Sequence, residues 1–136
     1  MITQAQTFTA LESTKYISLV TFRKSGAQVP TPVWFALHNG TIYVETFPSA
    51  GKLKRIHRTS RVTLAPCTLS GKVTGAATEG KARILADARE IATAEAALSR
   101  KYGLTRRLYN GTLDLIRALR RRPKVEQKYI AIVPVE

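Results

Sequence analysis

The sequence predicts a mainly β fold, a small antiparallel barrel with helical additions. Several segments alternate apolar and polar residues and are rich in β-branched and aromatic side chains, as in "KYISLVTFRK" at Lys15–Lys24. Short turn signals connect the first of these segments, which excludes a doubly wound parallel sheet. About six antiparallel strands are expected, and closing them into a barrel removes exposed edges.

The first three strands are expected to form a meander. The turn "SGAQ" separates the first two, and Asn39-Gly40, a strong hairpin signal, separates the second and third. Pro30 and Pro32 donate no ladder hydrogen bond, so the second strand should lie at an edge or begin with a bulge. The three predicted strands are Lys15–Lys24, Val29–Leu37 and Thr41–Phe47.

A short basic helix is expected next, within "FPSAGKLKRIHR" at Phe47–Arg58. Ser49 is a favourable N-cap residue, and the helix should extend over Ala50–Thr59. Its apolar residues fall on one helical face, and its lysines and arginines surround the rest.

The second half of the chain combines two more strands, a helical insertion and a last strand. Pro66 should bend or end the fourth strand, and Gly80 suggests a bulge or a barrel corner in the fifth. In the insertion, Asp87 is a predicted cap and Gly103 a predicted stop. After Gly103 the pattern fits one kinked helix or two short ones, because Asn110-Gly111 interrupts it. The segments are the strands Arg61–Leu69 and Ala76–Leu85, the helical residues 88–122 and the final strand 125–136.

Length and composition are those of a folded protein with an anionic partner. The chain has 136 residues, 44% of them hydrophobic, which favours a single domain over 1–136 with its own core. Neither a signal peptide nor a membrane-spanning apolar run is expected, and the single cysteine suggests a reduced, cytoplasmic protein. The net charge of +13 indicates nucleic acid, a phosphorylated cofactor or an acidic membrane surface as the partner.

Familiar catalytic and nucleotide-binding motifs are missing from the sequence. It has neither G-x-G-x-x-G after a strand nor a P-loop. His38, His57 and Cys67 lack the spacing of metal ligands, so no metal site is expected. Cys67 has no evident base nearby, so no nucleophile is assigned.

The start of the basic helix has the features of an anion site. A helix N-terminus offers unpaired N–H groups and partial positive charge. Ser49 adds a hydroxyl, Gly51 permits close approach to the backbone, and Lys52, Lys54 and Arg55 add full charges. A solvated amphipathic helix explains the same residues equally well.

A second feature lies one hairpin away, in "TPVWF" at Thr31–Phe35. An extended segment with free carbonyls and a tryptophan would flank a planar ring whose phosphate lies at the helix. The alternative is that Trp34 is a core residue.

These segments carry a family resemblance. The runs "KYISLVTFRKSGAQVPTPVWFAL" and "TIYVETFPSAGKLKRIHRTSRVTLAPCTLSGKVTG", with "RKYGL" at Arg100–Leu104, resemble the small flavin/deazaflavin oxidoreductases of the pyridoxamine 5′-phosphate oxidase-like superfamily. Within it, the group dependent on coenzyme F420 is the most similar. The resemblance covers nearly the whole chain.

The resemblance implies an FMN-binding-type split β-barrel homodimer with one cofactor in each of two interface grooves. The "TPVWF" strand would line the cofactor ring, and the basic helix would hold the phosphate. The family leaves redox chemistry to the cofactor, so the resemblance implies no catalytic side chain. The implied cofactor-binding residues are Thr31, Pro32, Val33 and Trp34 for the ring, Ser49, Ala50, Gly51, Lys52, Lys54 and Arg55 for the tail, and more weakly Ala65, Pro66 and Cys67.

The function expected from the resemblance is hydride transfer from reduced coenzyme F420 to a small unsaturated or conjugated acceptor. The phosphodiester and polyglutamate tail of F420 would suit the basic chain. One alternative keeps the fold but binds FMN or a tetrapyrrole. Another is a basic nucleic-acid-binding protein, although aromatic residues are only 7% of the chain and base stacking needs them. No membrane partner is expected.

Overall fold

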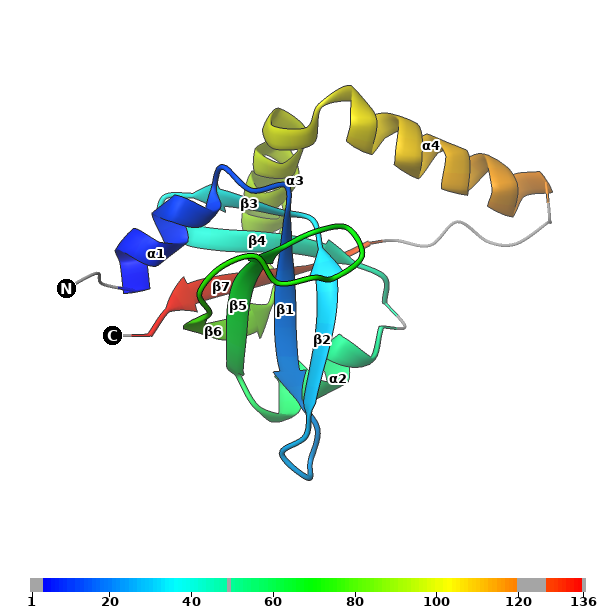
Figure 1. Ribbon diagram of the computed structural model, residues 1–136. Helices are drawn as coiled ribbons and strands as arrows, with labels where there is room; N and C mark the ends of the chain where they lie inside the picture. The colour runs from blue at the N-terminus through cyan, green and yellow to red at the C-terminus, as the bar shows by residue number, and fades with distance from the viewer. Residues whose placement is uncertain (1–3, 49, 120–126, 136) are drawn as a thin grey trace.

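The structure is a computed structural model of the chain, and it describes residues 4–48, 50–119 and 127–135. Within these residues, four helices accompany one antiparallel sheet of seven strands (Figure 1). In chain order the elements are α1 (Gln4–Leu11), β1 (Tyr16–Phe22), β2 (Gln28–Val33), β3 (Phe35–His38), β4 (Thr41–Thr46), α2 (Gly51–Arg58), β5 (Arg61–Cys67), β6 (Thr78–Ile84), α3 (Ala88–Tyr102), α4 (Leu104–Leu119) and β7 (Lys128–Pro134).

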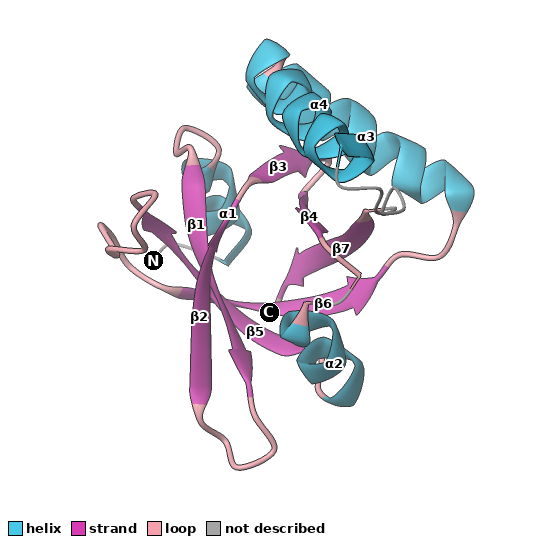
Figure 2. Ribbon diagram, turned by 90° about the vertical axis from the view of Figure 1, so that its right-hand side faces the viewer, coloured by secondary structure: helices cyan, strands magenta, loops and turns pink. Residues whose placement is uncertain are grey.

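The strand order confirms the mainly β split barrel and corrects the strand count. Neighbouring strands follow the order β2-β1-β5-β6-β7-β4-β3, so β2 and β3 lie at opposite ends of the sheet although one residue, Trp34, separates them in the chain. The sheet therefore curls round until its two ends meet at this residue (Figure 2). The prediction of a single strand over Val29–Leu37 was wrong, because Val33 pairs with Ile17 of β1 while Phe35 pairs with Val44 of β4.

The predicted edge position of the second strand is confirmed. β2, which carries both prolines, pairs with β1 and ends the strand order. A proline on an edge strand leaves the ladder of its single neighbour intact.

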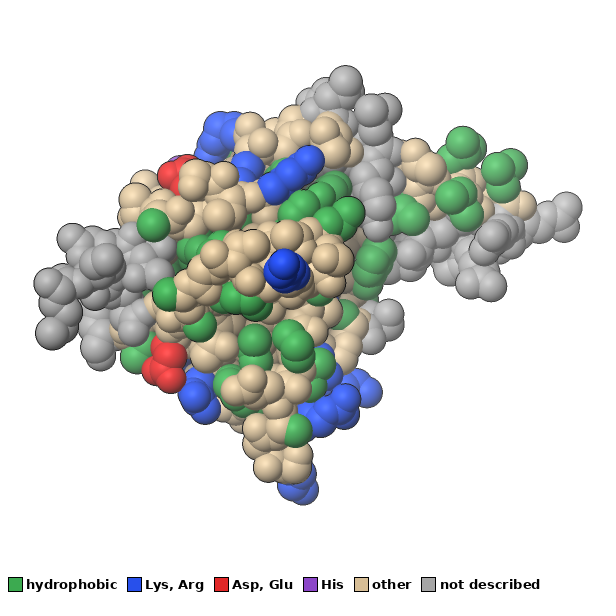
Figure 3. All heavy atoms as spheres, in the orientation of Figure 1, with side chains coloured by type: hydrophobic (Ala, Val, Ile, Leu, Met, Phe, Trp, Pro, Cys, Tyr) green, Lys and Arg blue, Asp and Glu red, His purple; other side chains and the backbone are tan. Residues whose placement is uncertain are grey.

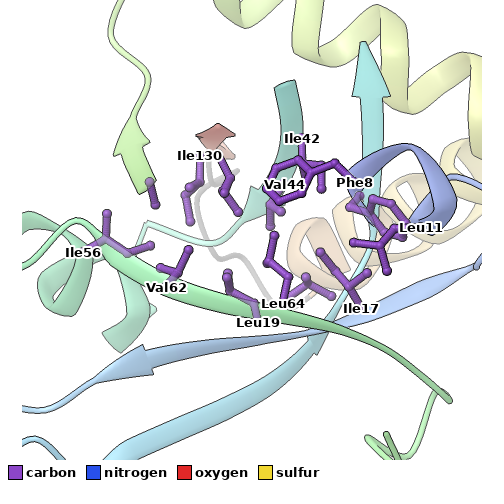
Figure 4. Packing of buried hydrophobic residues seen from close by; sticks show 14 residues of the cluster. Phe8, Leu11, Ile17, Leu19, Ile42, Val44, Ile56, Val62, Leu64 and Ile130 are labelled. Atoms are coloured by element: carbon purple, nitrogen blue, oxygen red, sulfur yellow. The ribbon is translucent and has the colours of Figure 1, made fainter. Parts of the chain in front are cut away.

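The barrel interior is filled mainly by aliphatic side chains from the strands, together with Phe35 of β3, two residues of α1 and Ile56 of α2 (Figure 4). Phe8 and Leu11 are almost completely buried in this cluster, and α1 packs against β6 and β7. The sequence analysis did not identify α1. Its signal is the spacing of Phe8 and Leu11, which puts both on one helical face.

Gly80 has a packing role, and the predicted bulge is wrong. Pairing is regular through Gly80 on both sides, with Val62 of β5 and Pro134 of β7. A Cβ at this position would lie 2.6 Å from Ile132 Cγ2 and 3.3 Å from Phe8 Cζ. Glycine is therefore needed here so that Phe8 and Ile132 can fill the barrel.

α3 covers the outside of the barrel over β3 and β4. Its small residues Ala94 and Ala97 allow close packing on Tyr43 and Tyr129 in a second apolar cluster. The predicted cap and stop are confirmed, since the Asp87 side chain accepts a hydrogen bond from the Arg89 N–H and Gly103 follows α3 with a φ of 55°.

α4 runs through Asn110-Gly111 without interruption, so the chain forms one helix here and its break is at Gly103. The helix extends away from the barrel (Figure 1). Arg120–Arg122 lie outside the described residues. None of the described helices is long and apolar enough to cross a membrane.

α2 begins one residue later than predicted. The N-cap is Ala50, whose extended backbone precedes the helix without a side-chain cap, so the prediction of Ser49 as N-cap was wrong. The helix phase is set by Ile56, which is 4% exposed and packs into the barrel core. Ser49 itself lies outside the described residues.

Candidate functional site

A pocket of about 410 Å³ lies where the bend between β2 and β3 meets the start of α2. It brings together four of the predicted cofactor residues, Pro32, Val33, Trp34 and Lys52. The bend and the helix are distant in the chain, but β3 pairs with β4, which leads directly into α2. The lining also includes Tyr16, Glu45, Thr46, Phe47, Leu69 and Gln127.

One wall of the pocket is apolar and contains Trp34. The indole stacks on Tyr102 of α3, with ring centroids 5.1 Å apart and planes 18° from parallel. Trp34 also packs against the second apolar cluster, while its remaining surface faces the pocket. The two interpretations of Trp34 from the sequence, core residue and pocket wall, therefore both describe it.

Tyr102 fixes the backbone beside this wall. Its hydroxyl accepts a hydrogen bond from the Phe35 N–H at 2.9 Å, and its single proton points to two carbonyl acceptors, Lys15 at 2.8 Å and Phe35 at 2.9 Å. Burial raises the pKa of Tyr102 to about 12, so the phenol stays protonated and able to donate. Tyr102 belongs to the "RKYGL" segment, and no role was predicted for it from the sequence.

The opposite end of the pocket is cationic. Lys52 is half-buried and its Nζ donates to Thr46 Oγ1 at 3.2 Å. Burial, with a smaller contribution from the Arg55 charge, lowers the pKa of Lys52. Among the described lining residues Lys52 is the one cation, and it is held at the first turn of α2, where backbone N–H groups are unpaired.

Arg55 lies beside this end and is directed toward β1. Its Nε donates to Thr21 Oγ1 at 2.6 Å. Burial, and then the charges of Arg23 and Arg58, lower the pKa of Arg55. A Cβ at Gly51 would lie 2.7 Å from Arg55 Nη1, so the absence of a side chain at Gly51 makes room for the guanidinium at the helix start. Lys and Arg side chains gather at this lower end of the molecule, over α2 and the β1–β2 hairpin (Figure 3).

The other predicted site residues that the structure describes do not line the pocket. Lys54 is exposed, and Ala50 is the half-buried N-cap of α2. The Thr31 hydroxyl donates to the Leu19 carbonyl at 3.5 Å. The β5 residues Ala65, Pro66 and Cys67 pair with Ser18, Ile17 and Tyr16 of β1. Cys67 is buried, which raises the pKa of its thiol.

Six lining residues were not identified from the sequence. Thr46 and Phe47 stand shortly before the basic helix, so their position in the chain could have indicated that they line the site. Tyr16, Glu45, Leu69 and Gln127 come from strand ends and loops that only the folded barrel brings together. Among the residues that the structure describes, His, Cys, Asp and Glu form no group of three or more that could hold a metal ion.

Comparison with known proteins identifies the fold. No family model and no curated protein sequence matches the chain. Among solved structures, a candidate pyridoxamine 5′-phosphate oxidase from Listeria innocua superposes with a TM-score of 0.63 at 13% identity, covering 98% of this chain and 94% of that one. A FAD-binding protein from Mesorhizobium loti gives 0.62 at 13% identity, covering 96% and 87%.

The haem storage protein HutZ from Vibrio cholerae gives a TM-score of 0.64 at 11% identity, covering 100% of this chain and 92% of that one. At sequence identities this low, the similarity establishes a shared fold and does not establish a shared activity. The chain therefore shares the split-barrel fold of these solved structures.

Proposed function

We propose that the protein is an oxidoreductase that binds reduced coenzyme F420 and passes a hydride to a small unsaturated or conjugated organic acceptor. The observation that carries the proposal is the single pocket that joins the Pro32–Trp34 wall to Lys52 at the start of a basic helix. This arrangement suits a planar ring with an anionic tail.

The residues present fit such a cofactor. The pocket volume of about 410 Å³ is within the range of small-molecule sites, and one wall is apolar and aromatic. A phosphate at the first turn of α2 would meet unpaired N–H groups and the Lys52 ammonium. We propose the tail contacts at Ser49, Ala50, Gly51, Lys52, Lys54 and Arg55, the ring contacts at Thr31, Pro32, Val33 and Trp34, and weaker contacts at Ala65, Pro66 and Cys67.

The protein's contribution would be binding and orientation. The bound cofactor supplies the hydride chemistry. Trp34, stacked on Tyr102, presents a fixed wall to one side of the pocket, and the Tyr102 hydroxyl holds the backbone at Phe35. A fixed wall positions ring and acceptor at contact distance and excludes water between them. No side chain is assigned as acid or base.

The choice of F420 over FMN rests on charge. F420 carries a polyglutamate tail in addition to its phosphodiester, and the chain has a net charge of +13. Arg23, Arg55 and Arg58 lie close enough that Arg23 and Arg58 lower the pKa of Arg55, so positive charge continues beyond the pocket. FMN is the second candidate, favoured by the similarity of fold to a FAD-binding protein.

Two further alternatives are less well supported by the described residues. Haem needs an axial ligand such as His, Cys, Met or Tyr, and the pocket lining offers one such group, the Tyr16 phenol. Binding single-stranded nucleic acid needs exposed aromatic rings. The large apolar side chains that are exposed in the described part of the chain are all aliphatic.

The proposal includes a homodimer in which each groove is completed by the partner chain. Its support is the apolar surface beyond the barrel, where Leu115, Ile116 and Leu119 of α4 are 60%, 40% and 75% exposed. Contiguous exposed aliphatic side chains on one helix are typical of interaction surfaces.

The direct experiment is titration of the purified protein with F420 and, separately, with FMN. Tighter binding of F420 than FMN, followed by acceptor-dependent oxidation of reduced F420, is the expected result. Tighter binding of FMN would support the flavin alternative. If neither cofactor binds with a dissociation constant below about 100 μM, the proposal is wrong.

A further inference from the structure

We infer that a second pocket, built around Lys101 at the end of α3, binds a small oxyanion, either a carboxylate or a phosphate. The pocket has a volume of about 320 Å³ and lies between the α1–β1 connection and the junction of α3 with α4. Its lining residues are Ser13, Thr14, Lys15, Lys101, Tyr102 and Thr105. The inference concerns a site separate from the proposed cofactor pocket and does not depend on it.

The main observation is an ammonium group without a hydrogen-bond partner. Lys101 Nζ is buried, and no described group accepts a hydrogen bond from it. It lies over the Phe35 ring, 3.4 Å from the centroid, and 5.6 Å from the Tyr102 ring centroid. Ring faces attract a cation but give its three N–H donors no oxygen acceptor. A buried charge in this state is unfavourable, and burial lowers the pKa of Lys101 to about 8.

The residues around the Lys101 ammonium favour an anion as its hydrogen-bond acceptor. Two of the six lining residues are lysines, and none is acidic. Outside the lining, Glu12 is close enough to raise the pKa of Lys101, which offsets part of the burial effect, but it does not accept a hydrogen bond from Nζ. An oxyanion in the pocket would supply the acceptors that Glu12 does not.

Access to the ammonium requires rotation of the lysine side chain alone. Lys101 itself lines the pocket, so rotation about its terminal bonds would move Nζ from the Phe35 ring face into the pocket. A lysine has a flexible four-carbon stem, and no hydrogen bond holds Nζ in its buried position.

The pocket has a built-in spectroscopic reporter. Tyr102 lines it and stacks on Trp34, which is the one tryptophan in the sequence. Occupation of the pocket should therefore change the fluorescence of Trp34 in protein that carries no cofactor.

The test is titration of cofactor-free protein with acetate and with inorganic phosphate, at constant ionic strength maintained with chloride. Trp34 fluorescence and the NMR shift of the Lys101 ε-methylene are followed together. We expect both signals to saturate with acetate, phosphate or both, and the Lys101 pKa to rise in the presence of the anion. Lys101→Met, made in the Lys52→Met background so that phosphate binding at Lys52 cannot contribute, should abolish the response. Lys81→Met, which changes an exposed lysine on β6, and Lys52→Met, which changes the cofactor pocket, should retain it.

Thermal unfolding separates a binding role from a structural one. The anion should raise the melting temperature of the wild type and of Lys81→Met, because it binds the folded state, but not that of Lys101→Met. Without anion, Lys101→Met should melt at the wild-type temperature or above, since an apolar isostere replaces an unpaired buried charge. A clear loss of stability in Lys101→Met, an anion response that survives in it, or a response lost in Lys52→Met would each overturn the inference. Cofactor titration of Lys52→Met tests the proposed function separately.

Discussion

At the scale of single residues, Lys52 combines a full charge, partial burial and a place in the lining of the larger pocket. Its neighbours Lys54 and Arg55 on α2 carry the same charge but do not line this pocket. Lys54 is exposed, and Arg55 is bonded to Thr21 of β1. The three cations that the sequence groups together therefore have separable roles, and substitutions can distinguish them.

We predict that Lys52→Ala weakens F420 binding by about ten- to a hundredfold, the usual effect of losing a hydrogen bond to a charged group. The fold should persist, because the Lys52 ammonium donates to a threonine hydroxyl and not to a buried carboxylate. Lys54→Ala should have a several-fold smaller effect, and Lys81→Ala serves as a control outside the pocket. Isothermal titration of the three variants measures this, and equal losses in Lys52→Ala and Lys54→Ala would contradict the structural distinction.

Arg83 and Glu90 form a two-point ion pair that ties α3 to β6. Arg83 Nη1 donates to Glu90 Oε1 at 2.6 Å, and Nη2 donates to Oε2. These hydrogen bonds hold the pKa of Glu90 below its ordinary value. Because the folded-state pKa of Glu90 is lowered, the ion pair contributes its full stability above the unfolded-state pKa, near 4.3. This stability is lost as the pH falls through the folded-state pKa.

We therefore predict that Glu90→Gln lowers the free energy of unfolding at neutral pH by about 0.5–1 kcal/mol, since both side chains retain solvent contact. The difference from wild type should shrink as the pH falls below about 4. Urea unfolding at a series of pH values measures it. Glu79→Gln, which removes the single contact between Arg61 and Glu79 at 3.4 Å, should have a smaller effect. A Glu90→Gln difference that grows in acid would show that the pair is not the cause.

At the scale of elements, alternation and turn signals were enough to locate the strands, except that β2 and β3 were predicted as one. The hairpin at Asn39-Gly40 and the cap at Asp87 were predicted from local sequence, because such signals depend on neighbouring residues alone. The bend at Trp34 could not be predicted this way. It exists because Val33 and Phe35 pair with strands at opposite ends of the sheet, which is a property of barrel closure. The same holds for α1, whose Phe8 is buried by strands far away in the sequence.

Two glycines in different elements should respond oppositely to alanine. In β6, Gly80→Ala would place a Cβ 2.6 Å from a branched methyl of Ile132, so we predict a loss of about 1–3 kcal/mol. In α4, a Cβ at Gly111 would meet nothing within 4 Å, and Gly111→Ala should stabilise by about 0.5–1 kcal/mol through helix propensity. Chemical denaturation of both variants measures the two effects, and stabilisation by Gly80→Ala would refute the packing role of that glycine.

At the scale of the whole molecule, two separate elements form the larger pocket. The bend at Trp34 between β2 and β3 provides its apolar wall, and α2 provides its cationic end. Tyr16, Glu45 and Gln127 complete the pocket from strand ends, which explains why the sequence predicted its two main parts and missed its rim. Thr31, Ala65, Pro66 and Cys67 are predicted contacts that lie outside this lining. If they also contact cofactor, the groove extends beyond this pocket along β2 and β5.

The proposed homodimer can be tested by substitutions on α4. Leu115 and Leu119 are exposed on α4, which projects from the barrel, and Figure 3 shows apolar side chains on this projecting part of the molecule. A Leu115→Glu/Leu119→Glu variant should shift the protein from dimer to monomer in light scattering coupled to size exclusion, because buried carboxylates without partners oppose association. Val73→Glu, a matched change at an exposed apolar residue in the loop between β5 and β6, should leave the dimer intact. The monomeric variant should also bind F420 more weakly, since half of each groove would be missing. A wild-type protein that is monomeric at all concentrations and still binds F420 would exclude the shared groove and leave the pocket of one chain as the complete site.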